Sequence, residues 1–343
     1  MEVCPNCFED AELKGFISSS KNIGICKICD SSNVPLLLID ELIDFFQGLI
    51  DNFKVLPDGE PLISKIQSNW NFFSTLNIGS IILNEVLSKI TSEIKNSEYL
   101  VDYTDDIIEN FSFWEILKDN LKKSNRYITN IEYLTEDLGW DGFFNTQFEL
   151  KSSDELYRAR VHHKSNLEAY SIKEMMCPPF NLAGGGRANP LGIPYLYLSD
   201  NPETVLYEVR ASYLDELSIG LFNLKKEIDF VKIVDFTEQT SLFQTTNIKQ
   251  TIKSKLLRDE ISRDLSKPMR RYDSEIEYIP TQFICEFIKI FTGASGIRFC
   301  SSLDPSGKNI VMFNQELMEC KNVFLKKIDK MHLKAVDHKT KDS

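Results

Sequence analysis

The sequence predicts an α+β protein with two domains: a helical N-terminal domain carrying a four-cysteine zinc knuckle, and a C-terminal mixed α/β domain with a small central sheet. Three observations lead to this prediction. Two Cys-x-x-Cys pairs lie within the first 29 residues, apolar residues recur at helical spacing from Ile39 to Leu121, and strand-like runs mixed with helical segments follow from Tyr157. With 343 residues and 42% hydrophobic content, the chain has enough apolar material for two cores.

The cysteine pairs are the strongest local pattern. Cys4-x-x-Cys7 and Cys26-x-x-Cys29 are separated by 18 residues, a spacing at which two tight turns present four thiolates to Zn²⁺. Since four protein ligands leave no open position on the metal, the zinc is expected to be structural. The other four cysteines show no such pairing and are expected to be small buried apolar residues: Cys177, Cys285, Cys300 and Cys320.

Amphipathic helices are expected after the zinc knuckle. Apolar side chains at three- and four-residue steps predict helices over residues 39–53, 81–90 and 107–121. A polar stretch with a Ser-Ser pair, residues 146–155, then places a domain boundary just before the strand at Tyr157. The predicted domains are residues 1–150, residues 151–326 and a polar tail over residues 327–343.

A glycine-rich loop lies near the middle of the chain. Gly184–Gly186 is followed directly by Arg187, and a fixed guanidinium beside an accessible backbone suits a phosphate group. Position 189 is Asn and no Lys-Ser/Thr follows, so neither the dinucleotide-binding Gly-x-Gly-x-x-Gly loop nor a P-loop is present. The loop therefore predicts a phosphate-bearing ligand and argues against a Rossmann-type fold.

Strands and helices follow this loop in close succession. Residues 195–198 form a predicted strand, and residues 200–203 supply an N-cap, a helix-starting proline and a first-turn carboxylate for a helix to about Leu214. The remaining predicted elements are a strand over 230–236, helix-forming sequence over 245–265, a helix over 279–291 ended by Gly293, and strands over 297–301 and 309–313 joined by a turn at 304–307.

Charge and hydropathy exclude other classes of protein. The chain has 51 acidic against 39 basic residues, and a net charge of −12 would repel a nucleic-acid backbone. No run of 18 apolar residues suits a membrane helix, and the first residues lack the basic and apolar regions of a signal peptide. A cytoplasmic protein that binds neither nucleic acid nor membranes is expected.

Seven short motifs follow one another through the second half of the chain. They are Tyr157-Arg158-Ala159-Arg160, Pro178-Pro179, Gly186-Arg187-Ala188-Asn189-Pro190, residues 195–199 (YLYLS), residues 203–209 (ETVLYEV), residues 278–282 (YIPTQ) and residues 296–302 (GIRFCSS). In order and content they resemble the RES domain, which is found in bacterial toxins that destroy NAD and is distantly similar to ADP-ribosyltransferases. The helical N-terminal region, which starts Cys4-Pro-Asn-Cys7, resembles the zinc-binding, HEPN-like module that accompanies some RES domains.

The resemblance implies a substrate and a site. The implied substrate is NAD, cleaved between nicotinamide and ribose by phosphorolysis or hydrolysis, and the closest variant is transfer of ADP-ribose to a protein. The residues that match the family's catalytic positions are Arg187, Tyr197 and Glu208, and those that match its substrate-binding positions are Arg158, Arg160, Asn189 and Ser301.

Within this set the roles differ. The resemblance implies that Arg187 holds a phosphate and that Tyr197 packs near the nicotinamide, while Glu208 stabilises the ribosyl cation. Two positions have neighbours that compete for the role, Glu203 with Glu208 and Ser302 with Ser301. The family pattern favours Glu208 and Ser301.

Two other classes of function stay open at this point. The chain could be a non-catalytic, zinc-containing interaction module, or a HEPN-type ribonuclease that uses an Arg-x4–6-His motif. The only match to that motif is Arg158 with His163, and no histidine precedes residue 157. Because related toxins are usually held by an antitoxin, an antitoxin or immunity protein is an expected partner, and the apolar helical faces suggest a homo-oligomer.

Overall fold

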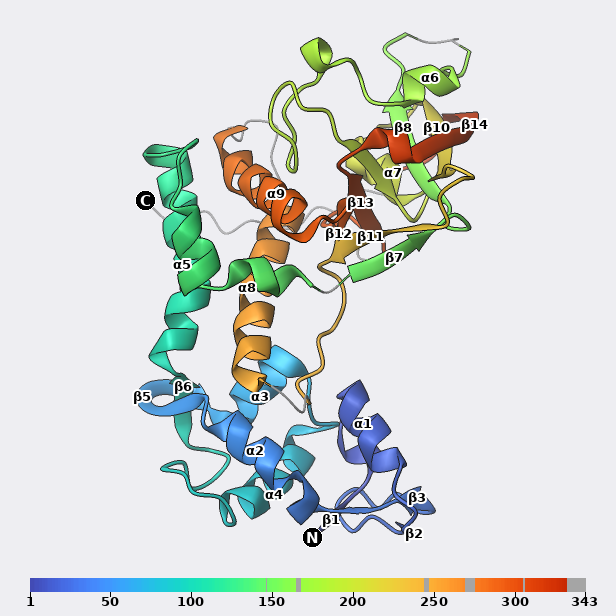
Figure 1. The fold of residues 1–343 in the computed structure, drawn as a ribbon. Coiled ribbons are helices and arrows are strands. Elements are labelled where there is room, and N and C mark those ends of the chain that lie inside the picture. The colour runs from blue at the N-terminus through green and yellow to red at the C-terminus, as the bar shows by residue number, and fades with distance from the viewer. Residues whose placement is uncertain (146, 165–167, 244–246, 269–274, 305, 332–343) are drawn as a thin grey trace, which may run out of the picture. The chain divides into compact units, whose positions relative to one another are not determined.

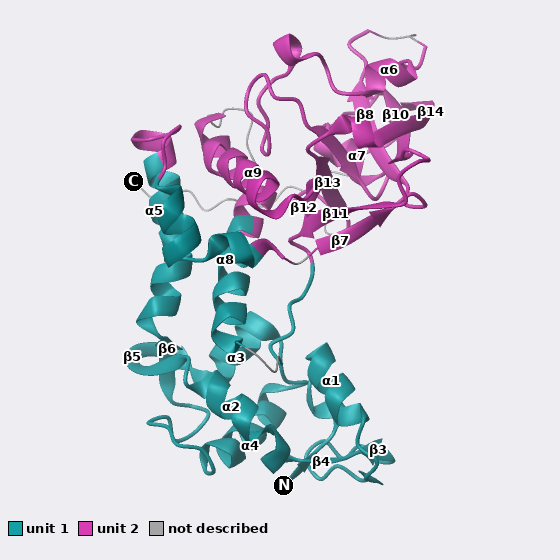
Figure 2. Ribbon diagram, viewed as in Figure 1, with its two compact units in different colours: residues 1–120, 130–143, 238–261 teal, residues 121–129, 144–237, 262–343 magenta. Residues whose placement is uncertain are grey.

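The computed structural model describes residues 1–145, 147–164, 168–243, 247–268, 275–304 and 306–331. The chain divides into two compact units: residues 1–120, 130–143 and 238–261 form unit 1, and residues 121–129, 144–237 and 262–343 form unit 2 (Figure 2). Unit 1 thus includes a segment, 238–261, that lies far along the chain. The boundary predicted at residues 150 and 151 stays a prediction, and residues 332–343 of the predicted tail lie outside the described residues.

Unit 1 is mainly helical (Figure 1). Its short strands form three antiparallel pairs, β1 with β4, β2 with β3 and β5 with β6. The elements in chain order are β1 (Glu2–Val3), α1 (Ala11–Ser18), β2 (Ile23–Gly24), β3 (Val34–Pro35), β4 (Leu37–Leu38), α2 (Ile43–Ile50), β5 (Phe53–Pro61), α3 (Leu62–Trp70), α4 (Leu76–Leu87), β6 (Leu100–Tyr103), most of α5 (Asp105–Lys123) and most of α8 (Ile248–Ser266).

The helical periodicity of the N-terminal sequence is confirmed. Helices α2, α4 and α5 lie within or overlap the three predicted ranges, and α2 buries Phe46, Leu49 and Ile50 as the apolar spacing requires. The predicted helix over 39–53 ends early, because Phe53 opens strand β5 and pairs with Tyr103 of β6. Their rings stack with centroids 4.9 Å apart, so tertiary pairing overrides the helical spacing at this residue.

Asp10 ties distant parts of unit 1 together. Its buried carboxylate caps α1 by accepting a hydrogen bond from the backbone N–H of Leu13 at 3.0 Å. It also accepts bonds from the Ser241 hydroxyl and from the backbone N–H of Leu242, the latter at 2.6 Å. A carboxylate near the N-terminus therefore holds the start of segment 238–261 within the unit.

Unit 2 is built on an eight-stranded sheet, larger than the small sheet expected from sequence. The strand order is β14-β10-β8-β9-β13-β12-β11-β7, and all neighbours are antiparallel except β11 and β12. Figure 1 shows the sheet with its short helices and α9. The elements are β7 (Gln147–Lys151), β8 (Leu156–Val161), α6 (Ile172–Met175), β9 (Leu196–Ser199), α7 (Thr204–Glu208), β10 (Glu216–Leu224), β11 (Phe230–Asp235), α9 (Ile279–Thr292), β12 (Gly296–Cys300), β13 (Lys308–Met312) and β14 (Met318–Lys327).

The predicted helix to Leu214 is wrong in both its start and its length. Helix α7 begins at Thr204, after Pro202, and Glu203 makes no side-chain capping bond. It ends at Glu208, where Arg210 takes a positive φ of 53° and the backbone N–H of Ala211 returns to the carbonyl of Leu206 at 3.0 Å. This left-handed residue ends the helix, and the chain continues to β10. Most residues of β10 are buried, so its sequence lacks the regular alternation of apolar and polar residues by which a half-buried strand is predicted.

A buried ion pair lies in the core of unit 2. Arg298 of β12 donates to the Asp235 carboxylate of β11 at 3.0 Å, and its guanidinium lies 4.2 Å from the ring centroid of Phe148. The two side chains are 13% and 6% exposed, so water compensates little for a lost partner.

Removal of one partner is expected to cost far more than removal of both. Asp235→Ala should lower the free energy of unfolding by about 3 kcal/mol, because it leaves the largely buried Arg298 cation with only the more distant carboxylate of Asp200, 3.8 Å from its Nη2. Replacing both residues by leucine should cost less than this single change. Glu316→Ala, which removes a 73% exposed partner of Lys225, serves as the control and should change stability little. Chemical denaturation measures the free energy of unfolding of the three variants. An equal loss of stability in Asp235→Ala and in the double leucine variant would contradict the prediction.

Among the described helices, none combines the length and the apolar character needed to cross a membrane.

Candidate active site and metal centre

Unit 1 brings the four predicted metal ligands together. The sulfur atoms of Cys4, Cys7, Cys26 and Cys29 all lie within 4.8 Å of one another, with closest separations of 3.4, 3.6 and 3.8 Å. Four thiolates at about 2.3 Å from a tetrahedral Zn²⁺ would be about 3.8 Å apart. The donor type, the number of donors and the spacing therefore all fit zinc.

Two tight turns carry these cysteines. The first pair flanks a single 3₁₀ turn, Pro5–Cys7, and in the second turn the backbone N–H of Cys26 donates to the carbonyl of Ser31 at 2.9 Å. Burial raises the pKa of Cys4 to about 12. Burial also opposes ionisation of Cys29, but hydrogen bonds with Ser31 lower its pKa to about 7. A bound cation would be needed to hold all four sulfurs as thiolates.

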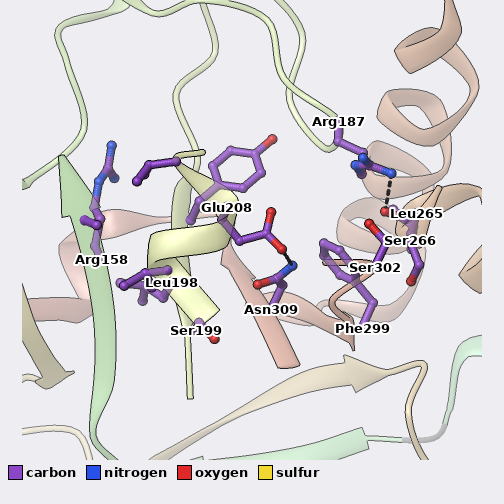
Figure 3. Close-up of a pocket in the computed structure, with 14 residues that line it drawn as sticks. Arg158, Arg187, Leu198, Ser199, Glu208, Leu265, Ser266, Phe299, Ser302 and Asn309 are labelled. Atoms are coloured by element: carbon purple, nitrogen blue, oxygen red, sulfur yellow. Dashed lines mark hydrogen bonds between the residues drawn. The ribbon is translucent and has the colours of Figure 1, made fainter. Parts of the chain in front are cut away.

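Unit 2 contains a cavity of about 290 Å³ beside strands β8 and β9 and helix α7 (Figure 3). Apolar side chains such as Val205, Leu265 and Phe299 form much of its wall. Its polar lining residues are Arg158, Arg187, Tyr197, Ser199, Glu208, Ser266, Ser302 and Asn309. Four of the seven residues predicted for the active site thus line a single cavity.

Glu208 is the carboxylate of this cavity. It is the last residue of α7, and its Oε1 accepts hydrogen bonds from the Ser301 hydroxyl at 2.7 Å and from the Asn309 amide at 2.8 Å. Figure 3 shows the Glu208 and Asn309 side chains pointing toward one another. Glu203, the competing carboxylate, does not line the cavity.

Arg158 brings a partly buried positive charge to the cavity from strand β8. Its Nη1 is buried and has no hydrogen-bond partner within the described part of the chain. Desolvation by burial lowers the pKa of Arg158, although a guanidinium stays protonated at any physiological pH. A buried guanidinium nitrogen without a hydrogen-bond partner is costly to the free protein, and an anionic ligand would satisfy it.

Arg187 brings a second, partly buried positive charge from the glycine-rich loop. Its Nη1 donates to the carbonyls of Asp264 and Leu265 at 3.2 and 2.6 Å, in the last turn of α8 (Figure 3). Desolvation lowers its pKa against the opposing charge of Glu208, and Arg187 forms no salt bridge with a carboxylate of the described residues. The C-terminal end of a helix favours a cation without neutralising it, so Arg187 keeps its charge for a ligand.

The loop around Arg187 is held by Tyr197 and Asn189. The Tyr197 hydroxyl accepts from the backbone N–H of Ala188 at 2.9 Å and donates to Asn189 Oδ1 at 2.7 Å. Asn189 Nδ2 donates to loop carbonyls, including that of Gly184 at 3.0 Å. Desolvation by burial raises the pKa of Tyr197, so its hydroxyl stays a donor. The two residues therefore shape the loop, and Tyr197 also presents its ring to the cavity.

The glycines of the loop differ in their importance. A Cβ at Gly186 would lie 2.6 Å from the Tyr197 hydroxyl and 2.7 Å from Asn189 Oδ1, whereas a Cβ at Gly184 would meet nothing within 4 Å. The close backbone approach expected of these glycines is thus an approach to Tyr197 within the protein.

Alanine substitutions test this difference. Gly186→Ala should lower the free energy of unfolding by about 1–3 kcal/mol, because the Tyr197 and Asn189 side chains must both move away from residue 186 to admit the methyl group. Gly184→Ala, its matched control, should leave stability within about 0.5 kcal/mol of wild type. Thermal unfolding measured at equal protein concentration distinguishes the two, and equal stability of both variants would contradict the loop geometry.

Three predicted site residues do not line the cavity. Arg160 donates to the backbone carbonyl of Glu174, and its guanidinium lies 5.9 Å from the ring centroid of Tyr170. The Asn189 amide donates its hydrogen bonds to carbonyls of the loop. Ser301 does not line the cavity but donates to Glu208, whereas Ser302 lines the cavity directly. Substrate binding by these three residues stays a prediction. Of the ribonuclease pair, Arg158 lines the cavity and His163 does not.

Sequence reasoning missed Asn309 and the end of α8. Asn309 opens a predicted strand but belongs to none of the motifs, and Leu265 and Ser266 come from a helix that carried no site prediction. The motif Tyr278–Gln282 had no assigned role. In the structure Thr281 Oγ1 donates to the carbonyl of Arg187 at 2.6 Å and Gln282 Nε2 to that of Gly186 at 2.8 Å, so the motif supports the arginine loop.

Comparisons with known protein families and structures concern mainly the second half of the chain. The crystal structure of the M. tuberculosis MbcT-MbcA toxin-antitoxin complex is similar at 13% identity and a TM-score of 0.30, over 55% of this chain and 92% of that chain, a likeness too weak to carry an argument. No curated protein matches. The family model of the RES domain matches residues 155–333, just over half of the chain and the segment that contains every residue of the cavity. The chain belongs to the RES domain family.

Proposed function

We propose that the unit 2 cavity binds NAD and cleaves the bond between nicotinamide and ribose. The observation that carries the proposal is the combination of a hydrogen-bonded carboxylate, Glu208, with two partly buried arginines that form no salt bridge among the described residues, Arg158 and Arg187. Membership of the RES family, whose toxins act on NAD, supports it.

The chemistry explains why such a set suits NAD. Loss of nicotinamide gives the ribose an oxocarbenium-like positive charge, which a nearby carboxylate stabilises more in the transition state than in the ground state. The pyrophosphate carries the negative charges of the substrate, and partly buried guanidiniums held in place by the protein bind it with little reorganisation. In this proposal Glu208 faces the ribose, and Arg158 and Arg187 hold the pyrophosphate.

The acceptor of the ADP-ribosyl group defines the reaction. Water would make the protein a glycohydrolase and phosphate would make it a phosphorylase, while a protein side chain would make it an ADP-ribosyltransferase on the same site. A non-catalytic interaction module is the alternative from another class. The intact set of Arg158, Arg187 and Glu208 in one cavity favours catalysis over that alternative.

The family context extends the proposal to biology. An enzyme that depletes NAD would arrest growth, so we place the protein in the cytoplasm as a toxin held by an antitoxin or immunity protein. Unit 1, with its four-cysteine cluster of Cys4, Cys7, Cys26 and Cys29, would be the RES-associated, HEPN-like module. Zinc bound there would supply a structural cross-link and no chemistry at the cavity, because the four sulfurs fill its coordination.

Incubation of the purified protein with NAD tests the activity. Release of nicotinamide and the identity of the ribosyl product are followed with and without phosphate. Loss of NAD that depends on phosphate and yields ADP-ribose-1″-phosphate would establish a phosphorylase, and loss without phosphate a glycohydrolase. If NAD remains intact in both conditions and with candidate protein acceptors, the proposal is wrong and the binding-module alternative gains support.

A further inference from the structure

Glu208 has little local support for a fixed orientation. It is an exposed residue at the end of a five-residue helix, α7, and a glutamate side chain loses rotamer freedom when it is held in one position. A carboxylate that must meet a developing charge needs a fixed geometry. The orientation must therefore come from neighbouring elements.

Two donors, one directly after β12 and one on β13, converge on one oxygen of this carboxylate. Ser301 lies directly after β12, and its Oγ accepts backbone N–H bonds from Leu303 and Asp304 at 3.2 Å each. Since a hydroxyl has one proton, that proton goes to Glu208 Oε1 at 2.7 Å. Asn309 must turn its amide nitrogen to the same Oε1, at 2.8 Å, because a carboxylate can only accept.

The backbone of Asn309 is fixed within the sheet. Strand β13 lies between β9 and β12, and Asn309 is paired with Ser199 on one side and Phe299 on the other. A short side chain on a strand paired on both sides has little freedom. It can thus fix a carboxylate that its own helix leaves mobile.

The second oxygen of the carboxylate is left for the ligand. Glu208 Oε2 has no hydrogen bond within the described part of the chain, and both Glu208 and Asn309 line the cavity. We infer that Asn309 is a positioning residue which, with Ser301, holds Oε1 of Glu208 so that Oε2 faces the ribosyl group. The inference rests on the proposed function, because it concerns the same carboxylate.

Substitutions of Asn309 separate positioning from direct binding of substrate. Asn309→Leu keeps the size of the side chain and removes the donor, and Asn309→Asp replaces the donor by an acceptor. Both should lower kcat for nicotinamide release by about 10–100-fold and leave KM within about threefold of wild type. The matched control is Asn223→Leu, which removes a strand asparagine that donates to the Asp154 carbonyl outside the cavity, and it should retain kcat within about twofold.

The Glu208→Ala background gives the sharper result. If Asn309 acts through Glu208, Asn309→Leu should change the residual kcat of Glu208→Ala by less than about twofold. A loss in that background equal to the loss in wild type would mean that Asn309 contacts the substrate itself, and it would overturn the inference. So would an Asn309→Leu protein with wild-type kcat.

Unfolding measurements keep the inference independent of the activity. If wild-type protein leaves NAD intact, the proposed function fails. The midpoints of denaturation of Asn309→Leu, Glu208→Ala and the double variant then show whether Asn309 holds Glu208. Asn309→Leu should shift the midpoint less in the Glu208→Ala background than in wild type, because the shared bond is already lost. Equal shifts in both backgrounds would overturn the inference on Asn309.

Discussion

Glu208→Gln is expected to lower kcat for nicotinamide release by about 10²–10³-fold. The amide keeps the size of the side chain but cannot stabilise positive charge on the ribose, so the loss should fall on kcat. The variant should fold normally, since Glu208 is exposed at the end of α7. Chromatographic assay of nicotinamide release at saturating NAD measures the effect, with the unfolding midpoint as the check on folding.

Glu203→Gln is the matched control for this prediction. Glu203 lies five residues earlier, directly before the same helix, and does not line the cavity. It should retain full activity. Loss of activity in Glu203→Gln together with full activity in Glu208→Gln would transfer the catalytic role to Glu203 and contradict the assignment of the cavity.

Cys7→Ser is expected to abolish zinc binding and to destabilise unit 1. Structural zinc in small sites contributes about 10 kcal/mol or more of apparent binding free energy at neutral pH, and that energy stabilises the fold that presents the ligands. Cys7 is fully buried in the core of unit 1, so its loss disturbs packing as well as coordination. Metal analysis should find one zinc per wild-type chain and none in the variant, and a chelator should lower the unfolding temperature of wild type alone.

Cys300→Ser controls for the general effect of removing a thiol. Cys300 is exposed, so the burial expected of it from sequence is wrong, and it lies outside the four-cysteine cluster. Its replacement should leave both the zinc content and the unfolding temperature unchanged. A Cys7→Ser protein that still bound one zinc with wild-type stability would show that the cluster is not a zinc site.

Local patterns explain which parts of the fold could be predicted from sequence. The two Cys-x-x-Cys pairs and the glycine that ends α9, Gly293 with φ of 66°, are signals within a few residues, and the structure confirms the cluster and the helix end. Strands β12 and β13 were both predicted and pair antiparallel, while residue 305 of the predicted turn between them lies outside the described residues. Strands β7, β10 and β14 were not predicted. Strand β7 lies in the polar stretch that was interpreted as a domain boundary. Strand β10 is buried along most of its length and β14 carries exposed lysines and a bulge, so neither shows a regular alternation of apolar and polar residues.

In the site, too, residues within short motifs could be predicted from sequence, and partners distant in the sequence could not. Arg187 and Glu208 were found through motifs, each of which spans only a few residues. The partners that orient them come from far along the chain: Leu265 lies 78 residues after Arg187, and Asn309 lies 101 residues after Glu208. No spacing rule connects such residues, because the sheet order and the path of α8 bring them together. The resemblance named the charged groups, and it included Ser301 and the motif Tyr278–Gln282 without indicating that they hold these groups in place.

The measurement that tests the central claim most directly is a crystal structure of the Glu208→Gln protein with NAD. The substitution should slow cleavage enough for intact NAD to remain bound. We predict the nicotinamide ribose beside residue 208 and the pyrophosphate in contact with the guanidinium of Arg158, Arg187 or both. NAD bound elsewhere, or a cavity that stays empty at millimolar NAD, would contradict the assignment of this cavity as an NAD-cleaving site.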